Sequence, residues 1–515
     1  MHLTPDFSVP VTCRSFVPVR PELVEGPFDK LRANGWVTRL IKQTSRLTFA
    51  TLLASAAHAQ SLPPEVDAAL VRAKVPREAV TVLVVDAQGR GPARLSHRAN
   101  VPVNPASIMK LVTTYAALDL LGPAFMWTTP VYVEGAVRDG TLFGNLYIKG
   151  QGDPKLVAER LWLLLRRVQG LGVKAIAGDI VLDRSAFETV EVDPASFDGE
   201  GLRPYNATPD ALLLNFKSVV MTFVPDRTAT TAQVQFEPPL AGVMMQASVP
   251  LSAGECGDYQ TTLKGDFVDP GAIRFNGTYP ANCGEKVWSV AYVDPKTYAV
   301  RAVEGLWRDM GGKLAGAVRE GRVPATLKPA FEVNSPTLVE VIRDINKFSN
   351  NVMAQQLFLS LSLQAKSGSA GTLGGAGTLA GSREVVQRWW KNTISTNSDD
   401  APLLDNGSGL SRTERITALG LARLLQTAHA SPLNPELISS LPIIGVDGTL
   451  RRNRSKAQGS AHLKTGTLRD VVGMAGYVHA PNGRQYVLVM IINHANAGAA
   501  RPAMDALLDW TIKDN

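Results

Sequence analysis

The pattern of apolar residues changes near residue 130 and again near residue 290, and this change constrains the fold more than any other feature. Residues 108–121 carry apolar side chains at helical spacing and end at a Gly-Pro pair. Residues 131–290 carry short apolar runs separated by Gly, Pro, Asn and Asp, as strands joined by turns do, with one helical pattern at 155–169. Helical patterns return after Trp288. We therefore expect an α/β chain that contains a large, mainly β insertion of one or two domains.

Outside this insertion, the apolar periods predict a sheet with helices. Apolar runs at 81–86, 473–478 and 485–493 predict strands, and the Pro-Asn-Gly sequence between the last two is typical of a hairpin turn. Helical patterns occupy residues 338–348, 351–363, 383–390 and 418–428. Both element types are therefore expected on either side of the inserted region.

Two segments of the second half have other patterns. Residues 366–382 are rich in Gly and low in complexity, which predicts a flexible surface loop. Residues 503–512 are expected to form a short helix. Packing on the sheet and anchoring to a membrane are the two alternatives for this helix. We favour packing on the sheet, so no transmembrane anchor is expected.

The composition excludes several classes of protein. Of the 515 residues, 45% are apolar and 19% are charged, which is ordinary globular usage and excludes a disordered, collagen-like or coiled-coil chain. The formal net charge of +7 is a small bias for this length. It gives little reason to expect nucleic acid as a partner.

The first 59 residues have the pattern of a signal peptide behind an additional N-terminal segment. A basic region and an apolar run at 47–54 precede Ala57-His58-Ala59, so we expect cleavage after Ala59 and a periplasmic protein. The apolar run is too short to span a bilayer. Residues 1–36 contain five prolines and no clear apolar period. We interpret them as lying upstream of the true translation start near Val37; a genuine disordered extension is the alternative.

Two cysteines remain once the leader is removed. In an exported protein, Cys256 and Cys283 are expected to form a disulfide. It would close a loop of about 27 residues and contribute roughly 3 kcal/mol through chain entropy. Two separate buried thiols are the alternative.

Ser107 and Lys110 stand at the start of the helical pattern of residues 108–121. Three residues apart on a helix, they share one face. A neutral amine in this position can take the proton of a serine hydroxyl and make it a nucleophile, and the helix N-terminus favours the developing negative charge. Taken alone, such a pair is more often a helix cap beside a solvated lysine.

Lys464-Thr465-Gly466, followed by Thr467, precedes the predicted hairpin and is expected on a strand of the same sheet. Gly466 would allow a close backbone approach, while Lys464 and Thr465 could hold a carboxylate through charge and hydroxyl. A polar edge strand explains the triplet equally well when it is considered alone.

A Ser-x-Asn sequence occurs at two places of interest. Ser349 and Asn351 lie in a short break between two predicted helices, whereas Ser395 and Asn397 lie in a polar stretch that is typical of a loop. We favour the first pair, because a helix break can direct both side chains toward a cleft.

In this order, Ser-x-x-Lys, Ser-x-Asn and Lys-Thr-Gly resemble the motifs of the active-serine penicillin-recognising enzymes. Within that superfamily the chain is most similar to the class C low-molecular-mass penicillin-binding proteins, the D-alanyl-D-alanine carboxypeptidase/endopeptidases. The stretches at 150–154, 405–412 and 441–450 add to the resemblance, which covers nearly the whole chain after residue 59. The long interval between the first two motifs fits the domains inserted there in this family. The family often has Asp where this chain has Asn350.

The resemblance implies a β-lactamase/transpeptidase-like domain, an antiparallel sheet flanked by helices, which is split by the insertion. It would place residues 60–130 and 291–515 in this catalytic domain and residues 131–290 in the inserted, mainly β domains. Residues 1–59 would be the N-terminal extension and signal peptide.

The resemblance also implies roles for the motif residues. Ser107 would attack the penultimate D-alanine of a peptidoglycan stem peptide ending in D-Ala-D-Ala, Lys110 would be the base, and Ser349 would pass the proton to the leaving amine. The backbone N–H groups of Ser107 and Thr467 would form the oxyanion hole. Substrate binding would fall to Asn351, Lys464, Thr465, Gly466 and Thr467. β-Lactam antibiotics would be covalent inhibitors. We expect no cofactor, and no metal site, because the histidines lack a ligand spacing such as HExxH.

Two other functions fit the same motifs: a serine β-lactamase with fast deacylation, and a non-catalytic peptidoglycan-binding protein.

Two further sequence patterns are interpreted as structural. The basic run at 451–456 is expected to be a solvated loop rather than a site for an anionic polymer, and Trp389-Trp390 is expected at the core and its rim rather than stacked on sugars. The sequence ranks neither carboxypeptidase nor endopeptidase activity first, and it predicts no oligomeric state.

Overall fold

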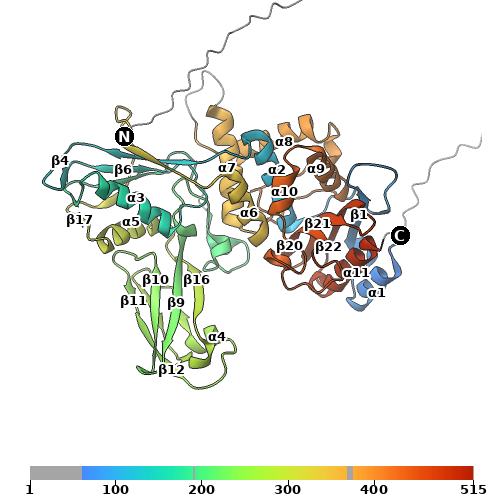
Figure 1. The fold of residues 1–515 in the computed structure, drawn as a ribbon, viewed down its shortest axis with the longest axis horizontal. Coiled ribbons are helices and arrows are strands. Elements are labelled where there is room, and N and C mark those ends of the chain that lie inside the picture. Colours follow the sequence, from blue (N-terminus) through green and yellow to red (C-terminus); the bar gives the residue numbers. More distant parts are fainter. Residues whose placement is uncertain (1–60, 190–191, 368–374, 514–515) are drawn as a thin grey trace, which may run out of the picture. The chain divides into compact units, whose positions relative to one another are not determined.

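One antiparallel sheet joins the two ends of the chain (Figure 1). In the computed structural model, which describes residues 61–189, 192–367 and 375–513, the strand order is β2-β1-β22-β21-β20. These strands are β1 (Val80–Asp86), β2 (Leu95–His97), β20 (Ala461–Leu468), β21 (Val471–His479) and β22 (Gln485–Asn493). β1 pairs with β22 along its whole length, from Val80 opposite Ile492 to Asp86 opposite Tyr486. The predicted hairpin is confirmed as β21 and β22.

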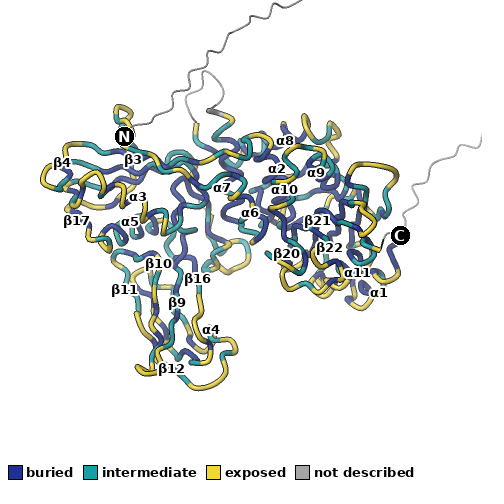
Figure 2. Tube along the Cα trace, viewed as in Figure 1, coloured by how far each residue is buried: buried dark blue, intermediate teal, exposed yellow. Residues whose placement is uncertain are grey.

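Helices cover both faces of this sheet. Helices α1 (Pro64–Arg72) and α11 (Arg501–Ile512) pack on one face, and α2 (Lys110–Leu121) and α9 (Ala418–Ala430) pack on the other. Alternate residues of β22 enter the two apolar cores, which is why its sequence is apolar almost without interruption. Figure 2 shows β21 and β22 as buried throughout. The helix predicted at 503–512 therefore packs on the sheet, as we favoured, and no described helix is long and apolar enough to cross a bilayer.

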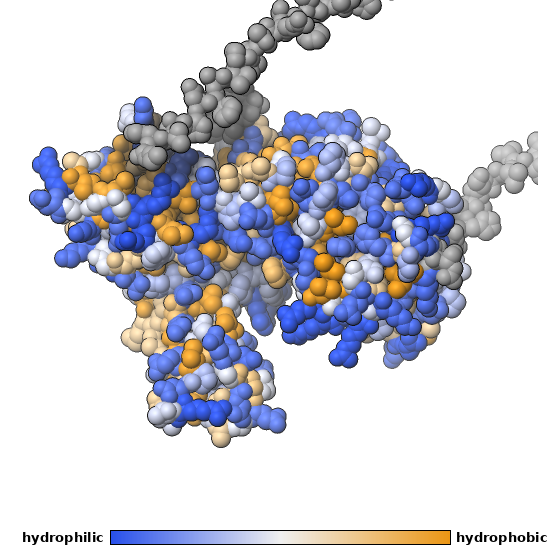
Figure 3. Space-filling view, in the orientation of Figure 1, coloured by the Kyte–Doolittle hydropathy of each residue, from blue (hydrophilic) through white to orange (hydrophobic). Residues whose placement is uncertain are grey.

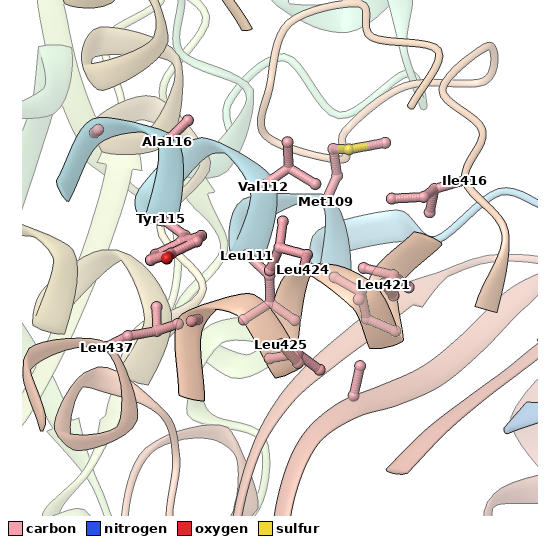
Figure 4. Packing of buried hydrophobic residues seen from close by; sticks show 14 of the residues in the cluster. Met109, Leu111, Val112, Tyr115, Ala116, Ile416, Leu421, Leu424, Leu425 and Leu437 are labelled. Carbon is pink, nitrogen blue, oxygen red and sulfur yellow. The ribbon is translucent and has the colours of Figure 1, made fainter. Parts of the chain in front are cut away.

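Helix α2 lies inside the helical layer and is buried on every side from Lys110 to Leu118. Met109 and Val112 belong to the same core as Leu421 and Leu424 of α9 (Figure 4). A helix that is apolar on all sides must pack against other elements on every side, which cover it from water. The cover comes from α6 (Leu338–Phe348), α7 (Asn351–Ser367), α8 (Leu379–Thr393), α9 and α10 (Asn434–Ser440). These surrounding helices exclude water from the start of α2 and fix its position.

The inserted region contains two groups of strands. The first group forms the sheets β18-β8-β6-β3-β19 and β17-β7-β5-β4, with helices α3 (Ala158–Gly170) and α5 (Tyr298–Asp309). Its strands are β3 (Thr128–Val133), β4 (Ala136–Arg138), β5 (Thr141–Phe143), β6 (Leu146–Lys149), β7 (Ala175–Ile176), β8 (Ile180–Asp183), β17 (Lys313–Leu314), β18 (Val318–Glu320) and β19 (Phe331–Asn334). The mainly β character expected from the sequence is therefore present in this group.

The second group forms the sheets β15-β12-β10-β9-β16 and β11-β14-β13, with the short helix α4 (Tyr259–Leu263). Its strands are β9 (Ser218–Asp226), β10 (Thr231–Glu237), β11 (Met244–Met245), β12 (Ser248–Ser252), β13 (Gly265–Asp266), β14 (Ala272–Phe275), β15 (Tyr279–Pro280) and β16 (Lys286–Ala291). The predicted disulfide between Cys256 and Cys283 is present here. One apolar core runs through both groups, from Leu164 and Trp307 to Phe223 and Tyr279.

Strand pairing places the end of the insertion later than the sequence pattern does. β18 pairs with β8 and β19 pairs with β3, so the chain still belongs to the inserted sheets at Asn334. We therefore propose a boundary near residue 335 rather than at 290. Helix α5, which follows residue 290 and was not among the predicted helices, packs on these sheets. A helix pattern does not reveal which sheet the helix covers.

The prediction of a flexible loop at 366–382 is wrong at both of its ends. Helix α7 continues to Ser367, Gly377 forms a β-bridge with Phe187, and α8 begins at Leu379. Residues 368–374 lie outside the described residues, as does the predicted leader at 1–59.

Candidate active site

Ser107 lies in the 3₁₀ turn η2 (Ala106–Met109), directly before α2. Ala106 has a φ of 49°, a left-handed conformation that non-glycine residues seldom adopt. Asn104 holds this conformation, because its side chain accepts a hydrogen bond from the Ala106 N–H at 2.8 Å and donates one to the Ser411 carbonyl at 2.9 Å. These two hydrogen bonds fix the turn and therefore the position of the Ser107 hydroxyl.

Two glycines allow the backbone to approach this turn closely. A Cβ atom at Gly409 would lie 1.9 Å from the Ala106 carbonyl oxygen, and one at Gly466 would lie 2.4 Å from that of Pro105. Gly409 also has a φ of 79°. A side chain at either position would push the turn, and Ser107 with it, away from β20.

The Lys110 ammonium group faces three oxygen atoms. Its Nζ lies 3.0 Å from Ser107 Oγ and 2.6 Å from Asn351 Oδ1, and it also donates to the Ser408 carbonyl. The side chain is fully buried. Burial, and then the charge of Lys464, hold the pKa of Lys110 well below its usual range, although Glu414 opposes the shift. The shift favours the neutral amine, which is the form that can take a proton from Ser107.

Lys464 is the second buried lysine of the site. Its Nζ donates to Ser349 Oγ and to the Thr465 carbonyl, both at 2.9 Å. Burial lowers the pKa of Lys464 to about 7. The two lysines thus lie on opposite sides of the site, one beside Ser107 and the other beside Ser349.

Ser349 and Asn351 occupy the break between α6 and α7. Ser349 ends α6 in the left-handed conformation, with a φ of 57°. The Asn350 side chain accepts a hydrogen bond from the Met353 N–H at 3.0 Å, so it caps the start of α7. An aspartate at this position, which the resemblance led us to expect, would supply the same acceptor. Asn351 is buried, and its Nδ2 donates to the Tyr205 carbonyl at 3.4 Å.

A cavity of about 530 Å³ opens beside these residues. Strand β20 is the edge strand of its sheet; its first residues bridge to Ile443, and beyond Leu463 its outer edge borders the cavity. The walls come from η2, the Ser349 turn, β20, the segment before β20, and α11. The lining residues are Ser107, Ser349, Thr449, Leu450, Arg452, Asn453, Arg454, Thr465, Gly466, Thr467, Gly473, Arg501, Met504 and Asp505.

The structure brings together all eight residues that the three motifs nominated. Ser395 and Asn397, the second Ser-x-Asn pair, do not line this cavity. Ser395 Oγ accepts a hydrogen bond from Arg423, and Asn397 caps a surface 3₁₀ turn at Ser398–Asp400. Trp389 and Trp390 are both buried in the helical layer, with Trp389 Nε1 donating to Asp119, so the structural interpretation of this pair is confirmed.

The basic run at 451–456 is exposed at Arg451, Arg452, Arg454 and Lys456, as expected of a solvated loop. Arg452 and Arg454 also line the cavity that holds Ser107, a placement that the sequence did not indicate.

Sequence reasoning also missed Glu414. This carboxylate is fully buried, and its Oε1 accepts the backbone N–H groups of Asp405, Asn406 and Gly407 at 3.1, 3.2 and 2.9 Å. Burial raises the pKa of Glu414 in spite of these donors. It shapes the loop whose Ser408 carbonyl faces Lys110. The nearby stretch 405–412 was noticed only through the resemblance, and no spacing rule singles out this glutamate.

Comparison with known proteins gives a consistent result. The sequence profile of the D-Ala-D-Ala carboxypeptidase 3 (S13) family matches residues 62–513. A D-alanyl-D-alanine carboxypeptidase of Actinomadura sp. (strain R39) is 29% identical over 506 residues, which cover 94% of this chain and 90% of the relative. The D-alanyl-D-alanine carboxypeptidase DacB of Haemophilus influenzae is 24% identical over 397 residues, covering 76% and 81%.

The fold agrees with these matches. The crystal structure of penicillin binding protein 4 (dacB) from Haemophilus influenzae superimposes with a TM-score of 0.68 at 21% identity, covering 87% of this chain and 99% of the other. The same protein in complex with a novel β-lactam gives a TM-score of 0.64 at 21% identity, with the same coverage. Because the family profile spans nearly all of the described residues, the chain belongs to the D-Ala-D-Ala carboxypeptidase 3 (S13) family.

Proposed function

We propose that this protein is a serine DD-peptidase that cleaves the D-Ala-D-Ala end of peptidoglycan stem peptides through an acyl-enzyme on Ser107. The observation that carries the proposal is the contact of 3.0 Å between Ser107 Oγ and the buried Lys110 Nζ, beside a cavity lined by Ser107 and by Ser349, to which a second buried lysine, Lys464, donates. A solvated lysine beside a helix cap would not have its pKa lowered by burial.

In the acylation step, Lys110 takes the Ser107 proton while Oγ bonds to the carbonyl carbon of the penultimate D-alanine. The backbone N–H groups of Ser107 and Thr467 stabilise the oxyanion that forms. The proton that Lys110 took from Ser107 is relayed through Ser349, which accepts a hydrogen bond from Lys464, to the leaving amine as the carbon–nitrogen bond breaks. Water then hydrolyses the ester and restores Ser107.

Substrate binding falls to the residues around the nucleophile. The Thr465 and Thr467 hydroxyls, with the charge of Lys464, suit the terminal carboxylate. Asn351 holds Lys110 through Oδ1 and offers Nδ2 to a substrate amide. β-Lactams, which mimic the D-Ala-D-Ala end, would acylate the same serine, and the relative from Haemophilus influenzae is known in complex with a β-lactam.

We further propose that the protein is exported to the periplasm and cleaved after Ala59. The basic region, the apolar run at 47–54 and Ala57-His58-Ala59 support this. N-terminal sequencing of the exported protein tests it: a mature chain that begins before Val37 would contradict both the cleavage site and the proposed start of translation.

Labelling with a fluorescent penicillin, followed by a chase, tests the enzymatic proposal. We expect long-lived label on the wild type, no label on Ser107→Ala, and normal label on Ser395→Ala, a serine from the second Ser-x-Asn pair. Rapid loss of label would instead indicate a β-lactamase, and no label on the wild type would indicate a non-catalytic binding protein. Release of D-alanine from a pentapeptide then confirms the peptidase.

A further inference from the structure

Three arginines face the cavity on one side of the nucleophile. Arg452 and Arg454 come from the segment before β20, and Arg501 begins α11. Among residues 61–189, 192–367 and 375–513, no carboxylate forms an ion pair with any of the three. The only acidic residue in the cavity lining, Asp505, accepts a hydrogen bond from Asn453 at 2.8 Å. This side of the cavity therefore has an excess of positive charge; in Figure 3 hydrophilic and hydrophobic side chains both lie on the surface near β20 and α11.

The segment that carries Arg452 and Arg454 is anchored to the fold. Asn453 Nδ2 donates to Asp505 at 2.8 Å, and Ser455 Oγ donates to Asp509 at 2.7 Å, one helical turn further along α11. The Arg452 and Arg454 side chains, each directly before one of these anchoring residues, are exposed and line the cavity. Asn453 and Ser455 thus fasten the segment to the helix and hold both arginines at the cavity.

The position of the three arginines indicates which half of a substrate they meet. Arg501 donates a hydrogen bond to the Thr467 hydroxyl at 3.3 Å, and Arg452 and Arg454 line the same cavity. In the proposed function, the Thr467 hydroxyl binds the terminal carboxylate of the leaving D-alanine. Arg501 therefore lies beside the leaving group, and the other two arginines extend the positive charge from there.

We propose that Arg452, Arg454 and Arg501 form a subsite for carboxylate groups of a leaving peptide, so that the enzyme favours cross-linked stem peptides over release of a single D-alanine. This inference rests on the proposed function. The guanidinium groups of arginine bind carboxylates through paired hydrogen bonds. A leaving D-alanine has one carboxylate, for which the threonines of β20 suffice. The leaving half of a cross-link is a peptide with further carboxylates, which these arginines can bind.

The chemical step is the same acyl transfer for both substrates. Ser107 Oγ bonds to the D-alanyl carbonyl carbon, the bond to the amine of the second peptide breaks, and that amine receives the proton from Ser349. Water supplies the oxygen and proton for hydrolysis of the ester. The arginines take no part in bond breaking and act only on the affinity for the leaving peptide.

The test compares two reactions of the full-length mature protein: cleavage of a purified cross-linked muropeptide dimer and release of D-alanine from a soluble pentapeptide. The variant is Arg452→Gln/Arg454→Gln. The control is Arg451→Gln/Lys456→Gln, which removes two charges from the same segment at positions outside the cavity lining. We expect the ratio of dimer cleavage to D-alanine release, each as kcat/KM, to fall about tenfold in the variant, mainly through KM, and to stay within about twofold in the control.

The measurement has clear contrary outcomes. An unchanged ratio in the variant, an equal fall in the control, or no dimer cleavage by the wild type would each overturn the subsite. If the variant unfolds, a salt series on the wild type replaces it, since screening should lower dimer cleavage more than D-alanine release. Absence of both penicillin label and D-alanine release would instead refute the proposed function itself.

Discussion

Buried charges are arranged in opposite ways in the inserted region and around Ser107. In the inserted region they are paired: Asp210 contacts Lys217 at 3.0 Å and also Arg184, and Asp153 contacts Arg160 at 2.6 Å. Around Ser107, two lysines are buried, and the charge of Lys464 lowers the pKa of Lys110.

This difference separates a structural role from a chemical one. A buried pair holds its neighbours in place, and its removal costs stability because one charge is left alone. A buried lysine beside a like charge loses its proton easily, which makes it a base at neutral pH. The comparison therefore predicts that the same kind of substitution will affect activity in one region and stability in the other.

The largest effect is expected for Lys110→Met. It removes the base but keeps an unbranched side chain in the buried site, so the rate of acylation by penicillin should fall by about 10²–10⁴. Stability should be largely retained, because an apolar side chain of similar length replaces a buried polar amine. Stopped-flow labelling and thermal unfolding measure the two effects. The matched control is Lys217→Met in the inserted region, which should lower the melting temperature while the folded protein is acylated at the normal rate.

The next effect concerns the paired charges. Asp210→Asn leaves Arg184 and Lys217 without their buried carboxylate, and we expect the free energy of unfolding to fall by about 3–5 kcal/mol. Urea denaturation measures this loss. If Asp210→Asn instead abolished acylation at unchanged stability, the assignment of these pairs to a structural role would be wrong.

The smallest effect, about 1.4 kcal/mol for each pH unit, is a dependence of stability on pH. Burial lowers the pKa of Lys464 from 10.5 to about 7, so the unfolded chain binds this proton more tightly between those two values. The free energy of unfolding should therefore rise as the pH increases from about 7 toward 10.5. Lys464→Met should remove this contribution. Urea denaturation of both proteins at several pH values in this window tests the sign, and identical slopes would show that burial does not perturb this lysine.

Short stretches of sequence were enough to predict several helices and strands and to identify the family. The apolar period predicted the helix that follows Ser107, and the hairpin of β21 and β22 followed from two apolar runs and a turn sequence. The predicted family, the β-lactamase/transpeptidase-like fold with its inserted domains and the class of activity, a serine-type D-Ala-D-Ala carboxypeptidase, are confirmed by the comparisons. These features depend on residues close together in the sequence.

Long-range features were predicted less well. We place the end of the inserted region past 290, as proposed above, because β18 and β19 pair with strands that are more than 100 residues earlier in the chain, at β8 and β3. The Gly-rich loop is shorter than predicted because Gly377 forms a bridge with Phe187. Both errors arise because strand pairing depends on distant partners, which composition does not identify.

The sequence by itself determined which chemical groups are present: a serine with a lysine one turn away, a second lysine before a Thr-Gly pair, and a serine with an asparagine in a helix break. Only the tertiary structure decided which Ser-x-Asn pair faces Ser107, how far burial lowers the pKa of each lysine, and that Arg452 and Arg454 line the cavity. The physical reason is that the character of a side chain is local, whereas its solvation and its neighbours depend on segments brought together by folding.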